Sequence, residues 1–301
     1  MAKRQRQLLL DIVVLSLFGI LALPRWSTLL EDRVNLRLAQ SLPSWSHPLG
    51  TDHLGRDLLV RLSNAIGTAV IPLWLTTIAG AFLGAALAMI LVTASRSKVG
   101  YASMQSLKFV ASSLGAVPLT IATFALAVLF EEANLKAVLM ALGMIVLLQT
   151  YLQLLNHVQE SLGLGFWTAH EAIGGNLFDR IWRYGVQSAW ANELALNLGL
   201  KLRAAVIVEA TLSYLGFGIQ EPAASFGNIL SAHFAESLQG KWWVMAVTLL
   251  ALMVTAAAPQ AVIRLVATTL THRRRVSEAP HAPWAKIMAS GLQKQAPTSH
   301  I

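Results

Sequence analysis

Long uncharged runs alternate with short polar segments along the chain. Residues 64–94 and 242–263 hold no charged side chain, and residues 8–24 hold only Asp11. A helix of about 18 or more apolar residues is long enough to cross the hydrocarbon of a bilayer. These three runs therefore predict membrane-spanning helices.

Three further runs complete the predicted set, at residues 103–130, 135–156 and 192–215. Gly115 and Pro118 are expected to kink the first of them. The last is the most polar, because it contains Glu193, Lys201, Arg203 and Glu209. Charged groups at membrane depth are costly and normally face a cavity or a partner. Helix geometry places Lys201 and Arg203 about 200° apart, so both cannot face one path.

The distribution of Lys and Arg predicts which ends lie inside the cell. Basic residues cluster at 3–6, 96–98, 180–183 and 273–275, and cytoplasmic segments carry such an excess. We therefore predict an all-α polytopic membrane protein with six transmembrane helices and both termini cytoplasmic. The predicted divisions are an N-terminal helix at 1–24, an extracytoplasmic loop at 25–63, a transmembrane core at 64–271 and a cytoplasmic tail at 272–301.

Composition supports the membrane class and narrows the chemistry. The chain is 55% hydrophobic and 13% charged, against about 25% charged in a soluble domain. Its net charge of +8 gathers at helix ends rather than on a basic face, so nucleic-acid binding is not expected. No cysteine, phosphate-binding loop, HExxH or GxSxG motif is present. We therefore expect no catalytic residues and no directly bound cofactor.

The first polar loop contains HPLGTDHLGRDLLVRL, residues 47–62. Asp52 is expected to cap a helix, and two glycines permit tight turns. An apolar stripe then follows, at Leu54, Leu58, Leu59 and Leu62. His47, His53, Asp52 and Asp57 lack a metal-ligand spacing, so capping and ion pairing are favoured over a metal site.

A second polar segment, residues 160–190, lies between two predicted spans. It combines an apolar helical stripe with charged positions, and the pair Gly174-Gly175 divides it into two short helices. Such a helix pair suits a groove on a soluble partner. The same pattern also fits an amphipathic helix lying on the membrane surface.

Three stretches resemble the second permease subunit of peptide and nickel ABC importers. HPLGTDHLGRDLLVRL is similar to the PLGTD-x-x-GRD block of that family. EATLSYLGFGIQEPAASFGNIL, residues 209–230, is similar to its E-x-x-L-S-F-L-G-L-G-x-x-P-x-x-S-W-G block. Residues 168–187 fall where these permeases carry their cytoplasmic coupling motif. Gly174 matches the motif glycine, whereas Thr168 and Gln187 stand where glutamate and proline are usual.

The resemblance implies a type I ABC importer permease fold in a bacterial inner membrane. It implies a second permease subunit, two cytoplasmic ATPase subunits that bind ATP and Mg²⁺, and an extracytoplasmic solute-binding protein. The expected ATPase-coupling residues are Phe166, Trp167, Ala169, Ile173, Gly174, Phe178, Arg180 and Arg183. The candidate residues of the translocation path are Gln149, Gln153, Lys201, Arg203 and Glu209.

Two other functions fit the same pattern. An ion-coupled secondary transporter could use Asp11, Lys201 and Glu209, and a non-transporting scaffold could recruit a partner through residues 160–190. For an importer, the family's substrates are dipeptides, oligopeptides and nickel or metal–chelator complexes. We expect peptides, because the eight histidines of the chain are scattered.

Overall fold

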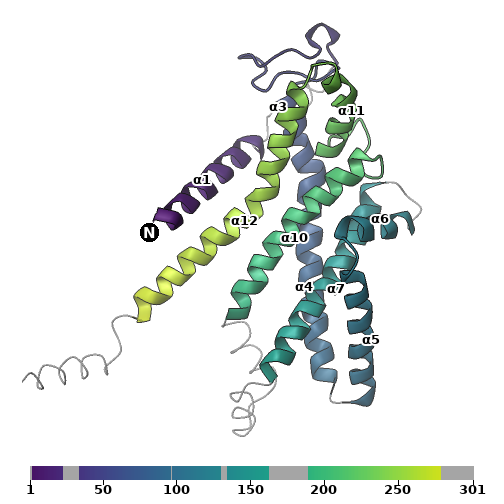
Figure 1. Ribbon diagram of the computed structural model, residues 1–301, viewed down its shortest axis with the longest axis vertical. Helices are drawn as coiled ribbons and strands as arrows, with labels where there is room; N and C mark the ends of the chain where they lie inside the picture. Colours follow the sequence, from purple (N-terminus) through teal and green to yellow (C-terminus); the bar gives the residue numbers. More distant parts are fainter. Residues whose placement is uncertain (1, 23–33, 96, 130–133, 163–188, 279–301) are drawn as a thin grey trace, which may run out of the picture.

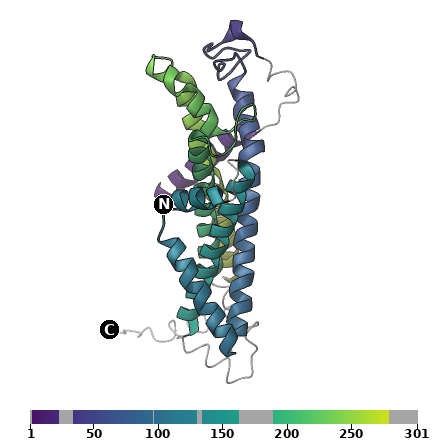
Figure 2. The ribbon, with the colours of Figure 1, turned by 90° about the vertical axis from the view of Figure 1, so that its right-hand side faces the viewer.

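The computed structural model describes residues 2–22, 34–95, 97–129, 134–162 and 189–278. Within these ranges the regular structure is helical, apart from one isolated bridge between Thr51 and Asp57. The helices form an elongated bundle, with α3, α11 and a compact loop at one end (Figures 1 and 2). Their bounds are α1 Ala2–Ala22, η1 Leu36–Leu38, α3 Leu58–Ala65, η2 Ile66–Val70, α4 Ile71–Ala94, α5 Lys98–Gly115, α6 Leu119–Leu129, α7 Leu135–Leu162, α10 Ala189–Tyr214, α11 Phe226–Leu238 and α12 Trp243–Glu278.

The all-helical prediction is confirmed over the described part of the chain. Four described helical stretches are long and apolar enough to cross a membrane: Gln5–Ala22, Leu58–Ala94, Leu135–Glu160 and Trp243–Ala267. The pair α5 and α6 makes a fifth if it counts as one span. Helix α10 forms as predicted, but with Glu193, Lys201, Arg203 and Glu209 it is not among these candidate spans. Six spans and cytoplasmic termini stay predictions.

The predicted kink between Gly115 and Pro118 is a complete break. Helices α5 and α6 meet at 110°, and the break between them consists of residues 116–118. Proline has no N–H for the helical ladder and disfavours helical geometry in the residue before it, so one straight helix cannot continue there. The interpretation of residues 103–130 as one continuous span is therefore replaced by two helices.

The second span begins earlier than expected, and its cap is a different residue. Helix α3 begins at Leu58, where Asp57 is the N-cap and accepts the N–H groups of Leu59 and Val60 at 2.8 and 3.2 Å. The prediction that Asp52 caps this helix was wrong, and Leu54 lies before the helix rather than on its stripe. A five-residue π-helical segment, η2, joins α3 to α4.

Glycines bring α4 and α7 into close contact. A Cβ atom on Gly84 would lie 2.2 Å from the carbonyl oxygen of Leu147, and one on Gly80 would lie 2.7 Å from that of Gly143. Gly80 and Gly84 form a small-xxx-small pattern, which allows the backbones of the two helices to approach closely. Helix α4 packs more extensively against α7 than against any other described helix.

We predict that Gly84→Ala destabilises the bundle. The added methyl would meet backbone atoms of α7, and overpacking of this kind typically costs about 1–3 kcal/mol. Thermal unfolding of the chain in detergent should show a lower midpoint. Gly19→Ala is the matched control, because a Cβ there meets nothing within 4 Å. An unchanged midpoint in Gly84→Ala would show that the two helices are not closely packed.

Candidate functional site

The two family-like blocks, residues 47–62 and 209–230, lie together at one end of the bundle although they are far apart in the sequence (Figure 1). The first block forms the loop at residues 47–57 and helix α3. The second forms the end of α10, a loop at residues 215–225 and helix α11. Two ion pairs, from Arg56 and Arg61 to Glu221, and a cluster of apolar side chains join the blocks.

Four charged side chains form the contact between the blocks, which we call the charge network: Asp52, Arg56, Arg61 and Glu221. Arg56 Nε donates to Asp52 Oδ2 at 2.6 Å, and its Nη2 donates to Glu221 Oε1 at 3.1 Å. Arg61 Nη2 donates to the same Glu221 oxygen at 3.0 Å, and its Nε lies 3.7 Å from Asp52 Oδ2. Each arginine thus bridges a carboxylate of the first block and the carboxylate of the second.

Three of the four side chains in the charge network are shielded from water. The side chain of Asp52 is fully buried, those of Arg56 and Arg61 are 6% and 2% exposed, and that of Glu221 is 39% exposed. Removing one partner of a buried pair leaves a charge that neither water nor protein compensates. The carboxylate of Glu221 lies at the surface and forms the solvent-facing side of the network.

Asp52 also holds the loop in its conformation through hydrogen bonds to the loop backbone. Its Oδ1 accepts the backbone N–H groups of Leu54 and Arg56 at 2.9 and 2.8 Å. Gly55 between them has a φ of +75°, and a Cβ there would lie 1.9 Å from the carbonyl oxygen of Asn35. The loop geometry therefore requires glycine at this position.

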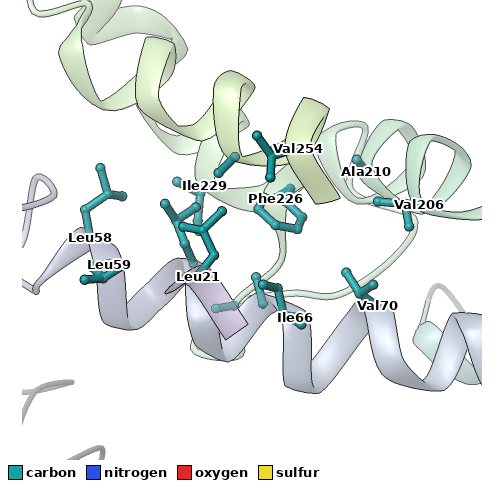
Figure 3. Packing of buried hydrophobic residues seen from close by; sticks show 14 of the residues in the cluster. Leu21, Leu58, Leu59, Ile66, Val70, Val206, Ala210, Phe226, Ile229 and Val254 are labelled. Carbon is teal, nitrogen blue, oxygen red and sulfur yellow. The ribbon is translucent and has the colours of Figure 1, made fainter. Parts of the chain in front are cut away.

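A cluster of buried apolar side chains also joins the two blocks (Figure 3). Leu58 of the first block packs in one cluster with Phe226 and Ile229 of the second. Ile66 of η2 belongs to the same cluster. Leu21 of α1 joins the same cluster. Charge pairing and hydrophobic burial therefore hold the same two blocks together.

The histidines and carboxylates of the first block form polar pairs. His47 Nδ1 lies 2.9 Å from Asp57 Oδ2, and His53 Nδ1 lies 3.1 Å from Nε2 of His233 on α11. No group of three metal-ligating side chains is found in the part of the chain that the structure describes. Of the predicted roles, ion pairing is seen for His47, Asp52 and Asp57, and capping is seen for Asp57.

A separate cavity lies between α4, α7 and α10, and Lys201 forms part of its wall. Its volume is about 200 Å³. Lys201 Nζ donates to Thr150 Oγ1 at 2.6 Å and lies 3.4 Å from Gln153 Oε1. The remaining lining residues are apolar: Ala81, Phe82, Ala85, Leu194, Ala195 and Leu198. The structure thus brings together a cation and two neutral polar groups in apolar surroundings.

The other predicted path residues do not line this cavity. Arg203 is exposed, as the 200° separation from Lys201 required. Glu209 is fully buried and accepts a hydrogen bond from Ser213 Oγ at 2.5 Å. Gln149 is half-buried on α7. The predicted set therefore divides, and only Gln153 and Lys201 belong to one cavity.

Sequence reasoning missed three partners of polar residues. Thr150 holds Lys201, Glu221 holds two arginines, and Arg264 Nη2 lies 3.1 Å from Asp11 Oδ1. The last pair joins α1 to α12 and accounts for an acidic residue in the first apolar run. A lone charge within an apolar run was the available signal, because such a charge requires a partner.

The predicted ATPase-coupling residues lie outside the described part of the chain. All eight fall within residues 163–188. The helices on either side, α7 and α10, end and begin next to that segment. The role of the eight coupling residues therefore stays a prediction.

Comparison with known proteins supports the family resemblance. No family model matches the chain. A protein of Brucella suis named as a peptide permease is 26% identical over 216 residues, which cover 72% of this chain and 69% of the relative. The oligopeptide transport system permease protein OppC of Bacillus subtilis is 27% identical over 229 residues, covering 74% and 70%. The di/tripeptide transport system permease protein DppC of Pseudomonas aeruginosa is 25% identical over 223 residues, covering 72% and 71%.

We predict that Asp52→Asn strongly destabilises this end of the bundle. The amide keeps the size of the side chain but removes the negative charge between two buried guanidinium groups. Breaking a buried pair typically costs about 3–5 kcal/mol. Chemical unfolding of the chain in detergent, followed by circular dichroism, measures the loss.

Glu221→Gln serves as the comparison for that variant. Its carboxylate is 39% exposed and water can replace part of its interaction, so its loss should be smaller. Equal, small effects of both variants would contradict a buried charge network.

Proposed function

We propose that this chain, which resembles the permease subunits of peptide ABC importers, is a membrane-spanning permease subunit of an ATP-driven peptide importer. It forms half of the translocation pathway and alternates between inward-facing and outward-facing states. The relatives named above are peptide permeases, which favours peptides over nickel or metal chelates. The proposed location is a bacterial inner membrane.

One structural observation carries this proposal. The two blocks that resemble the family lie far apart in sequence, yet Arg56 and Arg61 of one bind Glu221 of the other. This pairing joins the two blocks into one structural unit at that end of the bundle. We assign this end to the extracytoplasmic side, where a solute-binding protein would deliver its peptide.

The energy source is proposed to lie on other subunits. The chain has no GxxxxGK[ST] phosphate-binding motif, so two cytoplasmic ATPase subunits would bind ATP and Mg²⁺. Residues 160–190 would dock on those subunits and transmit their closure. A second permease subunit would supply the other half of the pathway. A partner can drive the change only by contacting the two states differently.

The cavity around Lys201 is proposed to line the pathway. A peptide carries a carboxylate, and a lysine ammonium in apolar surroundings attracts it more strongly than in water. Thr150 and Gln153 hold the ammonium by neutral oxygens, so its charge is not cancelled by either of them. Arg203 faces elsewhere and should not contribute.

Replacing Gly174 with leucine should uncouple transport from ATP hydrolysis. A bulky residue would disturb the turn between the two predicted coupling helices. ATP-driven peptide uptake by the reconstituted complex should fall at least about tenfold, equivalent to about 1.4 kcal/mol. The variant should still insert and copurify with the second permease.

Normal uptake by Gly174→Leu would contradict the role of this segment. If the intact complex copurifies without any ATPase subunit, the proposal that this chain belongs to an ATP-driven importer would be contradicted. Uptake in ATP-free vesicles under an imposed proton gradient would instead identify an ion-coupled transporter. If peptide uptake is unchanged after deletion of the gene, the non-transporting scaffold would be the remaining function.

Lys201→Met should lower uptake of peptides that end in a carboxylate. Loss of one charge-assisted hydrogen bond, about 1.5–3 kcal/mol, predicts a reduction on the order of tenfold to a hundredfold. Peptides with an amidated C-terminus should be taken up equally by variant and wild type. Arg203→Met is the matched control and should leave both rates unchanged. Equal loss for both kinds of peptide would contradict carboxylate recognition by Lys201.

A further inference from the structure

The contact between His53 and His233 depends on which nitrogens carry protons. His233 lies on α11, is 2% exposed, and its Nδ1 is 2.8 Å from the carbonyl oxygen of Ile229. A carbonyl oxygen only accepts, so Nδ1 must carry a proton. In the neutral ring, Nε2 is then the acceptor.

Since Nε2 of neutral His233 is the acceptor, both groups of His53 that face it must donate, which places a hydrogen on Nδ1 of the His53 ring. The backbone N–H of His53 points at it from 3.2 Å, and Nδ1 of the His53 ring lies 3.1 Å away. The two rings meet edge to face, with centroids 4.8 Å apart. A second proton on Nε2 would face a backbone N–H that cannot become an acceptor. The observed contact therefore fits only neutral His233.

The same geometry argues against a metal between the two rings. The single lone pair of Nε2 is directed at the N–H of His53. No third ligand completes a cluster in the described ranges. Asp52, the nearest buried carboxylate of the loop, is already engaged by two arginines.

The charged groups around His233 act in opposite directions. Burial lowers the pKa of His233, the hydrogen bond to Ile229 raises it, and the neighbouring His53 lowers it. Glu236 on α11 and Asp52 in the loop raise it, but the net direction is downward. Part of the field of Asp52 is offset by Arg56 and Arg61. Protonation of His233 is thus opposed by its surroundings as well as by its donors.

His47 in the same loop provides the opposite arrangement. Its Nδ1 faces the carboxylate of Asp57 at 2.9 Å. The carboxylate oxygen only accepts, so the hydrogen of that contact lies on the histidine nitrogen. In the other pair the acceptor is Nε2 of His233, and a proton there breaks its contact with His53.

We propose that His53 and His233 form a proton-sensitive latch, which fastens the loop at residues 47–57 to α11 while His233 is neutral and releases it in acid. Because burial holds the pKa of His233 below the ordinary 6.5, the released form binds the proton more readily. The latch is fully closed above pH 6.5 and weakens as pH falls below it. This behaviour belongs to the chain itself and does not depend on the proposed transport.

Hydrogen exchange of the His53 amide tests the latch directly, because that N–H is one of its two donors. The full chain in lipid nanodiscs is compared between pH 7.5 and 5.0, after division by intrinsic exchange rates. Protection of the segment containing His53 should fall by up to about tenfold for each pH unit below 6.5. Segments of α7 should keep their protection.

Three variants separate the latch from other titrations. His233→Gln keeps an acceptor that cannot take a proton, so protection should stay high at both pH values. His233→Phe removes the acceptor and should leave protection low at both. His47→Gln should retain the full wild-type decrease.

Three results would overturn the latch, and the first two can be read without the His233 variants. Wild-type protection that stays constant between pH 7.5 and 5.0 would show that His233 does not release the loop. Loss of the decrease in His47→Gln would assign it to His47 and Asp57 instead. A decrease in His233→Gln equal to that of wild type would overturn it as well.

Discussion

The pairing of Asp52 and Glu221 with two arginines is the constraint on which this end of the molecule depends. Arg56 and Arg61 lie almost entirely out of water, so their charges are tolerable only beside carboxylates. One of those carboxylates comes from the loop after α1, and the other comes from the loop after α10. The network therefore fixes how two distant parts of the chain meet. The apolar cluster that includes Leu58 and Phe226 joins the same two parts of the chain.

The same reasoning distinguishes structural from functional charges within the helices. Asp11 is paired with Arg264 across α1 and α12, so its charge is accounted for by packing. Lys201 instead contacts a hydroxyl and an amide oxygen beside a cavity. A charge held by neutral groups in apolar surroundings can still attract an anion. That difference makes Lys201 the stronger candidate for contact with a transported group.

The helices were predictable because the membrane demands long apolar runs. A kink near Pro118 was predictable because proline weakens a helix, but the full break into α5 and α6 was not. Asp57 rather than Asp52 caps α3, since Asp52 is occupied by the loop and by arginine, and local spacing could not distinguish these roles. The partners Thr150, Glu221 and His233 lie far along the chain from the groups they bind. No periodic pattern connects such residues, so only the folded structure brings them together.

A double-mutant cycle on Arg61 and Glu221 tests most directly whether the two blocks are locked together. The free energy of unfolding of the chain in lipid is measured for wild type, Arg61→Met, Glu221→Gln and the double variant. The charge network predicts that the two losses are not additive, with a coupling energy above about 0.5 kcal/mol. Losses that add within about 0.3 kcal/mol would contradict it, because independent sites behave in that way.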